Sequence, residues 1–188
     1  AAADAGGGGV HLLGVSLGGK LLAAYATWGG RSVRAASLSP VAPGIAAKVS
    51  PGLLVKCGVA FSLLFNSRRQ YRIPLSDPAL FTGNAHLQDY IAKDSYSLRR
   101  ATAGFLFISR TLDQRIERAP DGGIGIPVTL ILAADDRIID NEGCERAVLR
   151  LAGADIHVAV IEGAHTLEFE PDPSPLYRAV VEAALRGE

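Results

Sequence analysis

Polar residues occur at three places that lie far apart in the sequence, each shortly after an apolar run. Ser16 follows Val10 to Val15, the acids Asp135 and Asp136 follow PVTLIL, and His165 follows IHVAVI. A serine hydroxyl becomes a nucleophile when an imidazole takes its proton, and the imidazole needs a carboxylate to orient it. These residue types indicate acyl-transfer chemistry, provided that the fold brings them together.

The serine lies in the segment GVSLGGK, which matches the pattern G-x-S-x-G with glycines at Gly14 and Gly18. A strand is predicted before it and a helix after it, over Leu17 to Trp28. In such a strand-to-helix turn the serine backbone is strained, and the glycines leave room for the tight geometry. We expect the Ser16 hydroxyl to project from the end of the strand, where the Leu17 N–H can donate to a developing oxyanion.

Two other interpretations of this segment stay open. The residues from Gly14 to Lys20 also match the phosphate-loop pattern G-x-x-x-x-G-K, and LILAADD resembles the acid-ended strand that holds magnesium in nucleotide-binding proteins. Leu21 counts against this alternative, because a Ser or Thr should stand after the lysine to bind the metal. Ser16 could also simply cap the helix that follows it.

The acid and the base each have competitors. Asp135 and Asp136 both follow the same strand, so the spacing leaves open which of them orients the imidazole. Asp140 suits a helix cap better. His165 lies in a Gly-Ala-His turn, where a functional role is favoured over packing. The other histidines suit structural or solvated positions: His11, His86 and His157.

The elements expected to position these residues alternate between strands and helices. Strands are predicted at Val10 to Val15, Val33 to Leu38, Pro127 to Leu132 and Ile156 to Ile161, and helices at Leu17 to Trp28, 140–151 and Pro175 to Arg186. This alternation predicts an α/β fold with a parallel sheet flanked by helices. The polar residues then meet at the carboxyl edge of the sheet.

The pattern changes in the middle of the chain. Apolar helical stretches at Leu53 to Phe65 and Ala101 to Ile116 dominate residues 43–119, where no convincing strand is found. We therefore predict an α/β core made of residues 1–42 and 120–188, with an inserted helical cap over residues 43–119.

Composition excludes several classes of protein. With 19 basic and 19 acidic residues the net charge is zero, so the chain has no overall field to attract nucleic acid. Cys57 and Cys144 have no disulfide or zinc spacing, and the acids near Asp136 lack calcium-loop spacing, so no metal is predicted. There is no secretory signal and no apolar run long enough to span a bilayer, so a cytoplasmic location is expected.

The segments GVSLGGK, LILAADDRIIDN and EGAHTLEFEPD, together with DPALFTGNAHLQDYIAKD, resemble the α/β-hydrolase superfamily. The resemblance is specifically to its bacterial lysophospholipase and monoacylglycerol-lipase-like serine hydrolases, and it covers nearly the whole chain. It implies Ser16 as nucleophile, Asp136 as orienting acid, His165 as general base and the Leu17 amide as an oxyanion donor. It also implies hydrolysis of lipid-like esters through an acyl-serine, with no cofactor.

The chain departs from that family at its start. It begins almost at the strand before Ser16 and contains no methionine, so we expect a carboxyl-terminal part of an α/β-hydrolase fold. The family's second oxyanion donor comes from a loop before this point. A catalytically incomplete fragment that acts only as a binding module is therefore a further alternative.

The expected substrate is a small lipid-like ester. Apolar residues of the cap are numerous enough to line an acyl pocket: Val59, Phe61, Leu63, Leu64, Phe65, Phe105 and Phe107. The basic residues Arg68, Arg69 and Arg72 could meet a phosphate head group or form a solvated basic face. Transient contact of the cap with a membrane surface is also expected.

Overall fold

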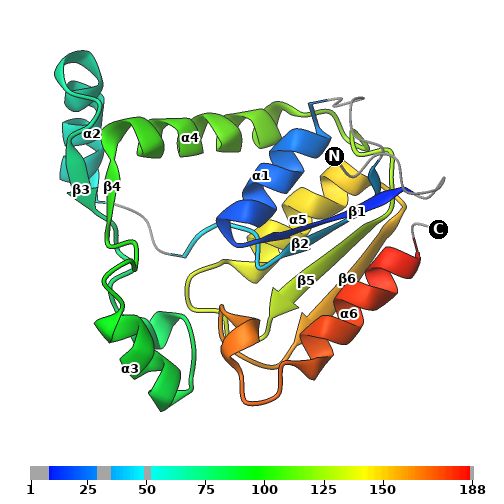
Figure 1. Cartoon of the computed structure of the whole chain (residues 1–188). Coiled ribbons are helices and arrows are strands. Elements are labelled where there is room, and N and C mark those ends of the chain that lie inside the picture. The colour runs from blue at the N-terminus through cyan, green and yellow to red at the C-terminus, as the bar shows by residue number, and fades with distance from the viewer. Residues whose placement is uncertain (1–8, 29–34, 49–51, 187–188) are drawn as a thin grey trace.

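The computed structural model describes residues 9–28, 35–48 and 52–186. Its centre is a four-stranded parallel sheet in the order β1-β2-β5-β6 (Figure 1). The strands are β1 (Val10–Val15), β2 (Ala35–Val41), β5 (Val128–Ala133) and β6 (Ile156–Ile161). This arrangement confirms the predicted α/β fold with a parallel sheet.

Helices cover both faces of the sheet, as parallel strands require. Helices α1 (Leu17–Ala26) and α5 (Asn141–Ala152) lie on one face, and α6 (Ser174–Leu185) lies on the other (Figure 1). All six residues of β5 are buried because this strand is covered on both sides. That double burial explains why its sequence, VTLILA, is apolar throughout instead of alternating.

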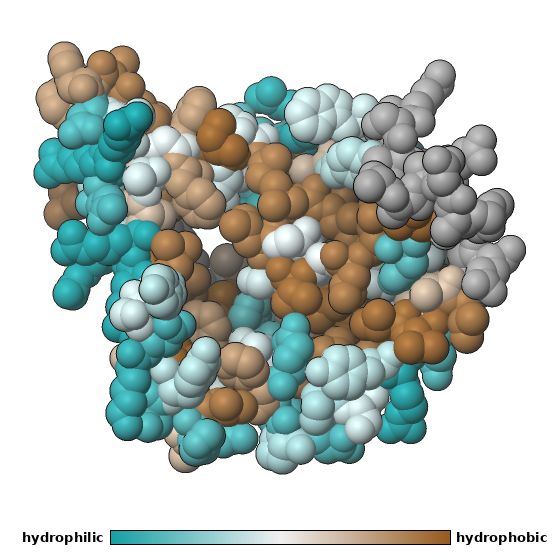
Figure 2. Space-filling model, viewed as in Figure 1, coloured by the Kyte–Doolittle hydropathy of each residue, from teal (hydrophilic) through white to brown (hydrophobic). Residues whose placement is uncertain are grey.

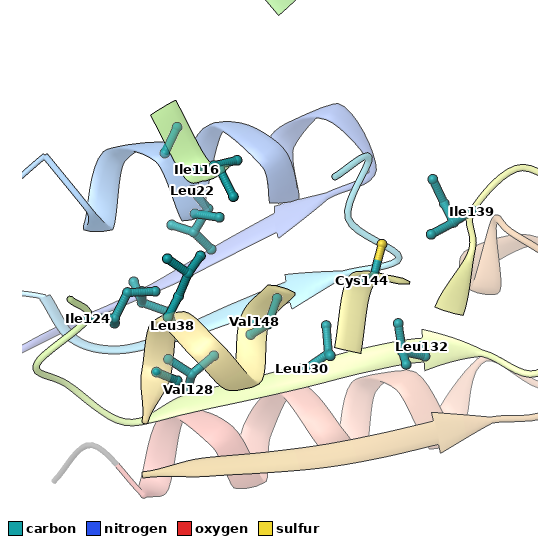
Figure 3. Close-up of a cluster of buried hydrophobic side chains, with 14 of the residues drawn as sticks. Leu22, Leu38, Ile116, Ile124, Val128, Leu130, Leu132, Ile139, Cys144 and Val148 are labelled. Carbon is teal, nitrogen blue, oxygen red and sulfur yellow. The ribbon is translucent and has the colours of Figure 1, made fainter. Parts of the chain in front are cut away.

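A separate hydrophobic cluster lies on each face. On the first face, Leu22 of α1 and Val148 of α5 pack with the sheet residues Leu38 and Leu130 (Figure 3). On the second face, Leu176 of α6 packs with Ile131 and its neighbours. Full burial of such a side chain stabilises the folded chain by about 1.5–3 kcal/mol. The two clusters together therefore hold the strands, and with them their carboxyl ends, in fixed positions.

The helices and strands described within the predicted cap of residues 43–119 lie at residues 53–118, between β2 and β5, and the name cap is used below for residues 53–118. They form α2 (Leu53–Phe65), β3 (Gln70–Arg72), the short 3-10 helix η1 (Pro78–Leu80), α3 (Ala85–Lys93), β4 (Arg100–Thr102) and α4 (Ala103–Arg118). Helix α4 runs across the molecule and packs on α1, whereas α2 stands at the far end of α4 (Figure 1).

The expectation that this region contains no strand is wrong. Strands β3 and β4 pair antiparallel, with Tyr71 opposite Ala101, and the Tyr71 hydroxyl lies 2.7 Å from the hydroxyl oxygen of Ser62 on α2. Three residues are too few to show a period of two, and the pairing joins segments about thirty residues apart. Helix α4 therefore begins two residues later than predicted, with the Thr102 side chain accepting from the Phe105 N–H.

Most other element bounds agree with the sequence-based expectation. Strands β1 and β6 and helix α2 have the predicted limits. Strand β2 runs on to Val41, and the first two residues of the predicted strand, Val33 and Arg34, lie outside the described residues. In the described part of the chain, no helix combines the length and apolarity needed to cross a membrane.

Candidate active site

Ser16 occupies a strained turn between β1 and α1. Its backbone angles are φ 50° and ψ −112°, in the left-handed φ range that residues with a side chain rarely adopt. Three hydrogen bonds hold it there: its N–H donates to the Val41 carbonyl at 2.9 Å, and its carbonyl accepts from the N–H groups of Gly44 and Lys20. The Ser16 side chain makes no helix-capping bond, so the simple capping role is wrong.

The glycines of the turn contribute unequally. A Cβ at Gly14 would lie 2.4 Å from the carbonyl oxygen of Gly18, and one at Gly19 would lie 2.9 Å from Pro43, whereas a Cβ at Gly18 meets nothing within 4 Å. The close approach of β1 to α1 therefore requires Gly14, and the close approach of α1 to the segment after β2 requires Gly19. The second glycine of the G-x-S-x-G pattern is not needed for space.

This inequality gives a matched pair of variants. We expect Gly14→Ala to lower the free energy of unfolding by about 2 kcal/mol, since overpacking against rigid backbone costs about 1–3 kcal/mol. Gly18→Ala should leave it unchanged or raise it by up to about 1 kcal/mol, because alanine favours a helix over glycine. Urea denaturation of both variants measures the difference, and equal midpoints would contradict the geometry.

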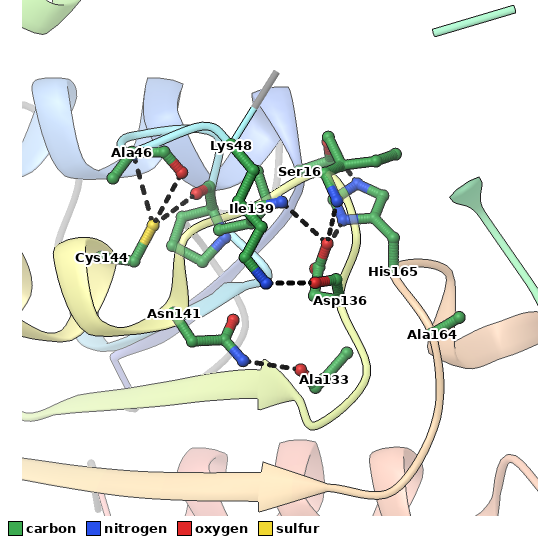
Figure 4. Close-up of polar contacts among 12 residues, drawn as sticks. Ser16, Ala46, Lys48, Ala133, Asp136, Ile139, Asn141, Cys144, Ala164 and His165 are labelled. Atoms are coloured by element: carbon green, nitrogen blue, oxygen red, sulfur yellow. Dashed lines mark hydrogen bonds and ion pairs between the residues drawn. The ribbon is translucent and has the colours of Figure 1, made fainter. Parts of the chain in front are cut away.

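The three polar side chains from separate strand ends form one chain of hydrogen bonds (Figure 4). The Ser16 Oγ lies 2.9 Å from Nε2 of His165, and Nδ1 of His165 lies 2.8 Å from Oδ2 of Asp136. His165 is 4% exposed and Asp136 is 2% exposed. With the proton on Nδ1 donated to the carboxylate, Nε2 is left free to accept the serine proton.

Asp136 is the acid that contacts His165, and Asp135 is exposed to solvent. The second carboxylate oxygen of Asp136 accepts from the N–H groups of Ile138 and Ile139, both at 2.8 Å. Burial by itself raises the pKa of Asp136, but the bonds from His165, Ile139 and Ile138 outweigh it and hold the pKa below its usual value. The group is therefore a fixed anion at neutral pH.

The segment after β2 ties the serine turn to the acid loop. Gly44 donates to Ser16, Ala47 pairs with Ile139, and the Lys48 ammonium donates to the backbone carbonyl of Asp136 at 2.6 Å (Figure 4). Sequence patterns give no sign of this role for Lys48, since the contacts link residues about ninety positions apart.

The two cysteines and the three other histidines are not part of this hydrogen-bonded group in the described part of the chain. Burial raises the pKa of the Cys144 thiol to about 11, and its sulfur contacts the Pro43 carbonyl. Cys57 is exposed and unpaired with Cys144. Nδ1 of His11 lies 2.7 Å from the Ser37 hydroxyl, and His157 and His86 are exposed. Over the described ranges, no three His, Cys, Asp or Glu side chains are grouped as a metal site needs.

The amino end of α1 lies directly beside Ser16. Leu17 is its first residue, and the first bond along the helix runs from the Lys20 N–H to the Ser16 carbonyl. The N–H groups before that bond, beginning with Leu17, have no partner within the helix, and they form its positive end. A negative charge that develops beside Ser16 is favoured there.

Ser16 and Leu17 open onto a cavity of about 1280 Å³ between the core and the cap. Figure 2 shows it as a hollow to the left of centre, with hydrophobic residues around it. Four of the apolar residues expected to line it do so, namely Val59, Leu63, Phe105 and Phe107. The other three expected residues lie outside it and are exposed: Phe61, Leu64 and Phe65.

The charged residues of the cavity differ from those expected. Arg68, Arg69 and Arg72 do not line it and are exposed, so the solvated basic face is where they lie. The lining cations are Lys20, Lys56, Arg99 and Arg110, and the lining acids are Asp94 and Asp113. The cavity is therefore mainly apolar with an excess of positive charge.

Lys20, which a phosphate loop would use to bind phosphate, forms an ion pair with a residue of the cap instead. Its ammonium lies 2.7 Å from Asp113 of α4 and 3.2 Å from the Ser109 hydroxyl. The two charged side chains are only 10% and 21% exposed. The ion pair therefore fastens the cap helix to the helix that follows Ser16, an arrangement that the phosphate-loop alternative does not explain.

Removing one partner of this pair should be costly. We expect Lys20→Met to lower the free energy of unfolding by about 2 kcal/mol. Removing one partner of a fully buried ion pair costs more, about 3–5 kcal/mol. The smaller figure follows because Arg110 still lies 3.9 Å from Asp113. The double variant Lys20→Met with Asp113→Leu should recover most of the loss in urea denaturation, and a loss equal to the sum of both single variants would contradict the pairing.

Comparison with known proteins finds a matching family model and similar solved structures for this chain. A family model described as serine aminopeptidase, S33, matches residues 1–172. The comparison with curated protein sequences gives no significant match. Among solved structures, the monoacylglycerol lipase of Paleococcus ferrophilus superposes with a TM-score of 0.79 at 20% identity, over 96% of this chain and 70% of that one.

Two further solved structures are similar. A soluble variant of the monoglyceride lipase of Saccharomyces cerevisiae, in complex with a substrate analog, has a TM-score of 0.74 at 14% identity, over 96% of this chain and 61% of that one. The enol-lactonase of Burkholderia xenovorans has a TM-score of 0.60 at 14% identity, over 94% and 65%. The chain thus spans about two thirds of their length, and at these identities the likeness is one of fold.

Proposed function

Because the chain belongs to the serine aminopeptidase, S33, family of hydrolases, we propose that it carries the catalytic residues of a hydrolase that cleaves lipid-like carboxylic esters through an acyl-serine. The observation that supports this most strongly is the chain of hydrogen bonds from Ser16 through His165 to Asp136, which opens on an apolar cavity. Residue types, distances and burial all agree with the requirements of nucleophilic catalysis.

The proposed reaction has two halves. In the first, Ser16 Oγ attacks the ester carbonyl while Nε2 of His165 takes its proton, and the imidazolium then gives that proton to the leaving alcohol. In the second, His165 takes a proton from water, the hydroxide attacks the acyl carbonyl, and the bond to Ser16 Oγ breaks while the imidazolium returns its proton to that oxygen, so the carboxylic acid is released and Ser16 is restored. Asp136 keeps the proton on Nδ1 and stabilises the imidazolium throughout. The Leu17 N–H is the proposed oxyanion donor.

The cavity favours an ester over a peptide as the substrate. Its apolar lining from α2 and α4 suits an acyl chain, and the excess of cations suits an uncharged or anionic head group such as glycerol or phosphate. A monoacylglycerol or a lysophospholipid satisfies both features. The free ammonium of an aminopeptidase substrate would meet Lys20, Lys56, Arg99 and Arg110, which disfavours it.

A substrate panel tests this proposal. The 188-residue chain is incubated with a fluorophosphonate probe, a monoacylglycerol, a lysophospholipid and an aminoacyl anilide. Labelling of Ser16 with hydrolysis of the two lipid esters is expected. Hydrolysis of the anilide alone would overturn the ester assignment, magnesium-dependent ATP binding without labelling would favour the phosphate-loop alternative, and neither activity would favour a binding module.

We further propose that the cap touches an anionic membrane surface from which the substrate enters. Large apolar side chains of α2 face solvent, among them Leu54 at 89% and Phe65 at 74% exposure. Figure 2 shows hydrophobic residues at the upper left, where α2 lies in the same view of Figure 1. The cap carries ten lysines and arginines against five acids, although the whole chain is neutral. Exposed leucine and phenylalanine beside basic residues is the composition of a surface that docks on anionic lipid.

Vesicle sedimentation measures this contact. Replacing Leu54 and Phe65 together by serine should weaken binding to phosphatidylserine-containing vesicles about tenfold or more, because burying each apolar side chain contributes on the order of 1 kcal/mol. Leu185→Ser on α6, a leucine that is also largely exposed, is the matched control. Equal binding of both variants, or equal binding to purely zwitterionic vesicles, would contradict the proposal.

A further inference from the structure

We propose that Glu170, a residue outside the hydrogen-bonded group described above, is a positioning residue for His165. This inference rests on the proposed function. Oε1 of Glu170 accepts a hydrogen bond of 3.0 Å from the N–H of Ala164, the residue directly before the histidine. The short helix η2 (Leu167–Phe169) turns the chain so that Glu170 returns to the start of its own loop.

The backbone under Glu170 is shaped to receive it. Gly163 has φ 139°, a conformation that favours glycine, and a Cβ there would lie 2.7 Å from Cγ of Glu170. Ala164 is 7% exposed, so its N–H has little access to water. The glycine therefore gives the Glu170 side chain room to lie on the backbone and reach that donor.

Bonds hold the loop on both sides of His165. Before it, the Gly163 carbonyl accepts from the Asp135 N–H at 2.9 Å, and Ala164 donates to Glu170. After it, the Thr166 N–H donates to the Phe81 carbonyl of the cap at 2.8 Å. Of these three bonds, only the one to Glu170 is made by a side chain. A substitution can therefore remove this bond and leave the other two in place.

The charge of Glu170 is not explained by an ion pair. Within the described ranges, no lysine or arginine lies within 4.0 Å of its carboxylate, and the residue is partly buried. A carboxylate without a cation partner is an expensive way to stabilise a loop. A charged acceptor does form a shorter and stronger bond to a backbone N–H than a neutral one, which suits a loop whose histidine must stay within reach of Ser16.

The test compares Glu170→Ala, Glu170→Gln and the control Glu162→Ala, which removes an exposed carboxylate from the same loop. Glu170→Ala should slow fluorophosphonate labelling and lower kcat about 10- to 100-fold, because small misplacements of a catalytic base cost rates of this order. KM should stay close to that of the control, whereas the thermal midpoint should fall by a few degrees because the buried Ala164 N–H loses its acceptor. Glu170→Gln keeps an acceptor oxygen and should restore most of the rate.

Labelling of Glu170→Ala at the wild-type rate would overturn the inference, as would a glutamine variant no faster than the alanine variant. If the wild-type chain itself does not label, the proposed function fails and a separate measurement decides about Glu170. Slow hydrogen exchange of the Ala164 N–H and a resolved NMR signal of the His165 Nδ1 proton are expected in the wild type. Both should be lost in Glu170→Ala, and their persistence would overturn the positioning role.

Discussion

We expect that replacing Ser16 or His165 by alanine will remove fluorophosphonate labelling and lower ester hydrolysis by about 10⁴- to 10⁶-fold, the loss that follows when a nucleophile or its base is removed. The reason is the 2.9 Å bond between Ser16 Oγ and Nε2 of His165. Without the imidazole the hydroxyl keeps its proton and is a weak nucleophile, and without the hydroxyl there is no atom to carry the acyl group. Mass spectrometry of the labelled peptide and initial rates on a monoacylglycerol measure both effects.

Two matched variants control for changes in folding. Ser76 also lines the cavity but has no histidine partner among the described residues, and His157 lies on the exposed side of β6. Ser76→Ala and His157→Ala should keep labelling and hydrolysis within about twofold, as is usual for substitutions away from the reacting groups. Labelling that survives in Ser16→Ala would assign the nucleophile to another residue.

The second large effect is expected from Asp136→Asn, which should lower kcat about 10⁴-fold, the magnitude known for the corresponding change in a Ser-His-Asp triad. One oxygen of Asp136 accepts from the N–H groups of Ile138 and Ile139, so an asparagine must place its own oxygen there. Its NH₂ group then faces Nδ1 of His165. The ring must accept at Nδ1 and carry its proton on Nε2, where it cannot take the proton of Ser16.

The adjacent acid provides the control for this substitution. Asp135 is exposed, and its side chain does not contact His165, so Asp135→Asn should keep kcat within about twofold. Equal losses in the two asparagine variants would contradict the assignment of Asp136. A loss of less than tenfold in Asp136→Asn would show that the imidazole does not depend on this carboxylate for its tautomer.

The same variant changes the dependence of stability on pH. The pKa of Asp136 is lower in the folded chain than in the unfolded chain, so the folded state binds this proton more weakly. Its contribution to stability is fully present above the unfolded pKa of about 3.9 and is lost as pH falls through the lower folded pKa. The free energy of unfolding, measured by urea denaturation between neutral and acid pH, should therefore fall more steeply for the wild type than for Asp136→Asn.

Local sequence patterns are enough to predict the parts of the fold that depend on neighbouring residues. The continuous apolar run of β5 predicts a strand buried on both faces, and Gly14 marks the turn where Ser16 is presented. Because parallel strands end at a common edge, the order of strands alone predicts that polar residues after β1, β5 and β6 approach one another. Short-range chemistry and one topological rule were sufficient for this.

Residues that are equivalent in the sequence can be told apart only by their contacts in the folded chain. Asp135 and Asp136 follow the same strand, but only the second turns inward, because the N–H groups of Ile138 and Ile139 hold its carboxylate. The β3–β4 pairing and the bond from Lys48 to the Asp136 carbonyl likewise join residues far apart in the chain.

Two charged residues, Lys20 beside the cap and Glu170 in the His165 loop, likewise have contacts that sequence patterns do not predict. Lys20 matches a phosphate-loop lysine in the sequence, yet in space it meets Asp113 of the cap. Glu170 belongs to no spacing pattern, and its bond to the Ala164 N–H depends on a glycine backbone and a short helix between them. The physical reason is that periodicity records which face of an element is buried, whereas side-chain pairing is fixed only when packing brings distant elements within contact distance.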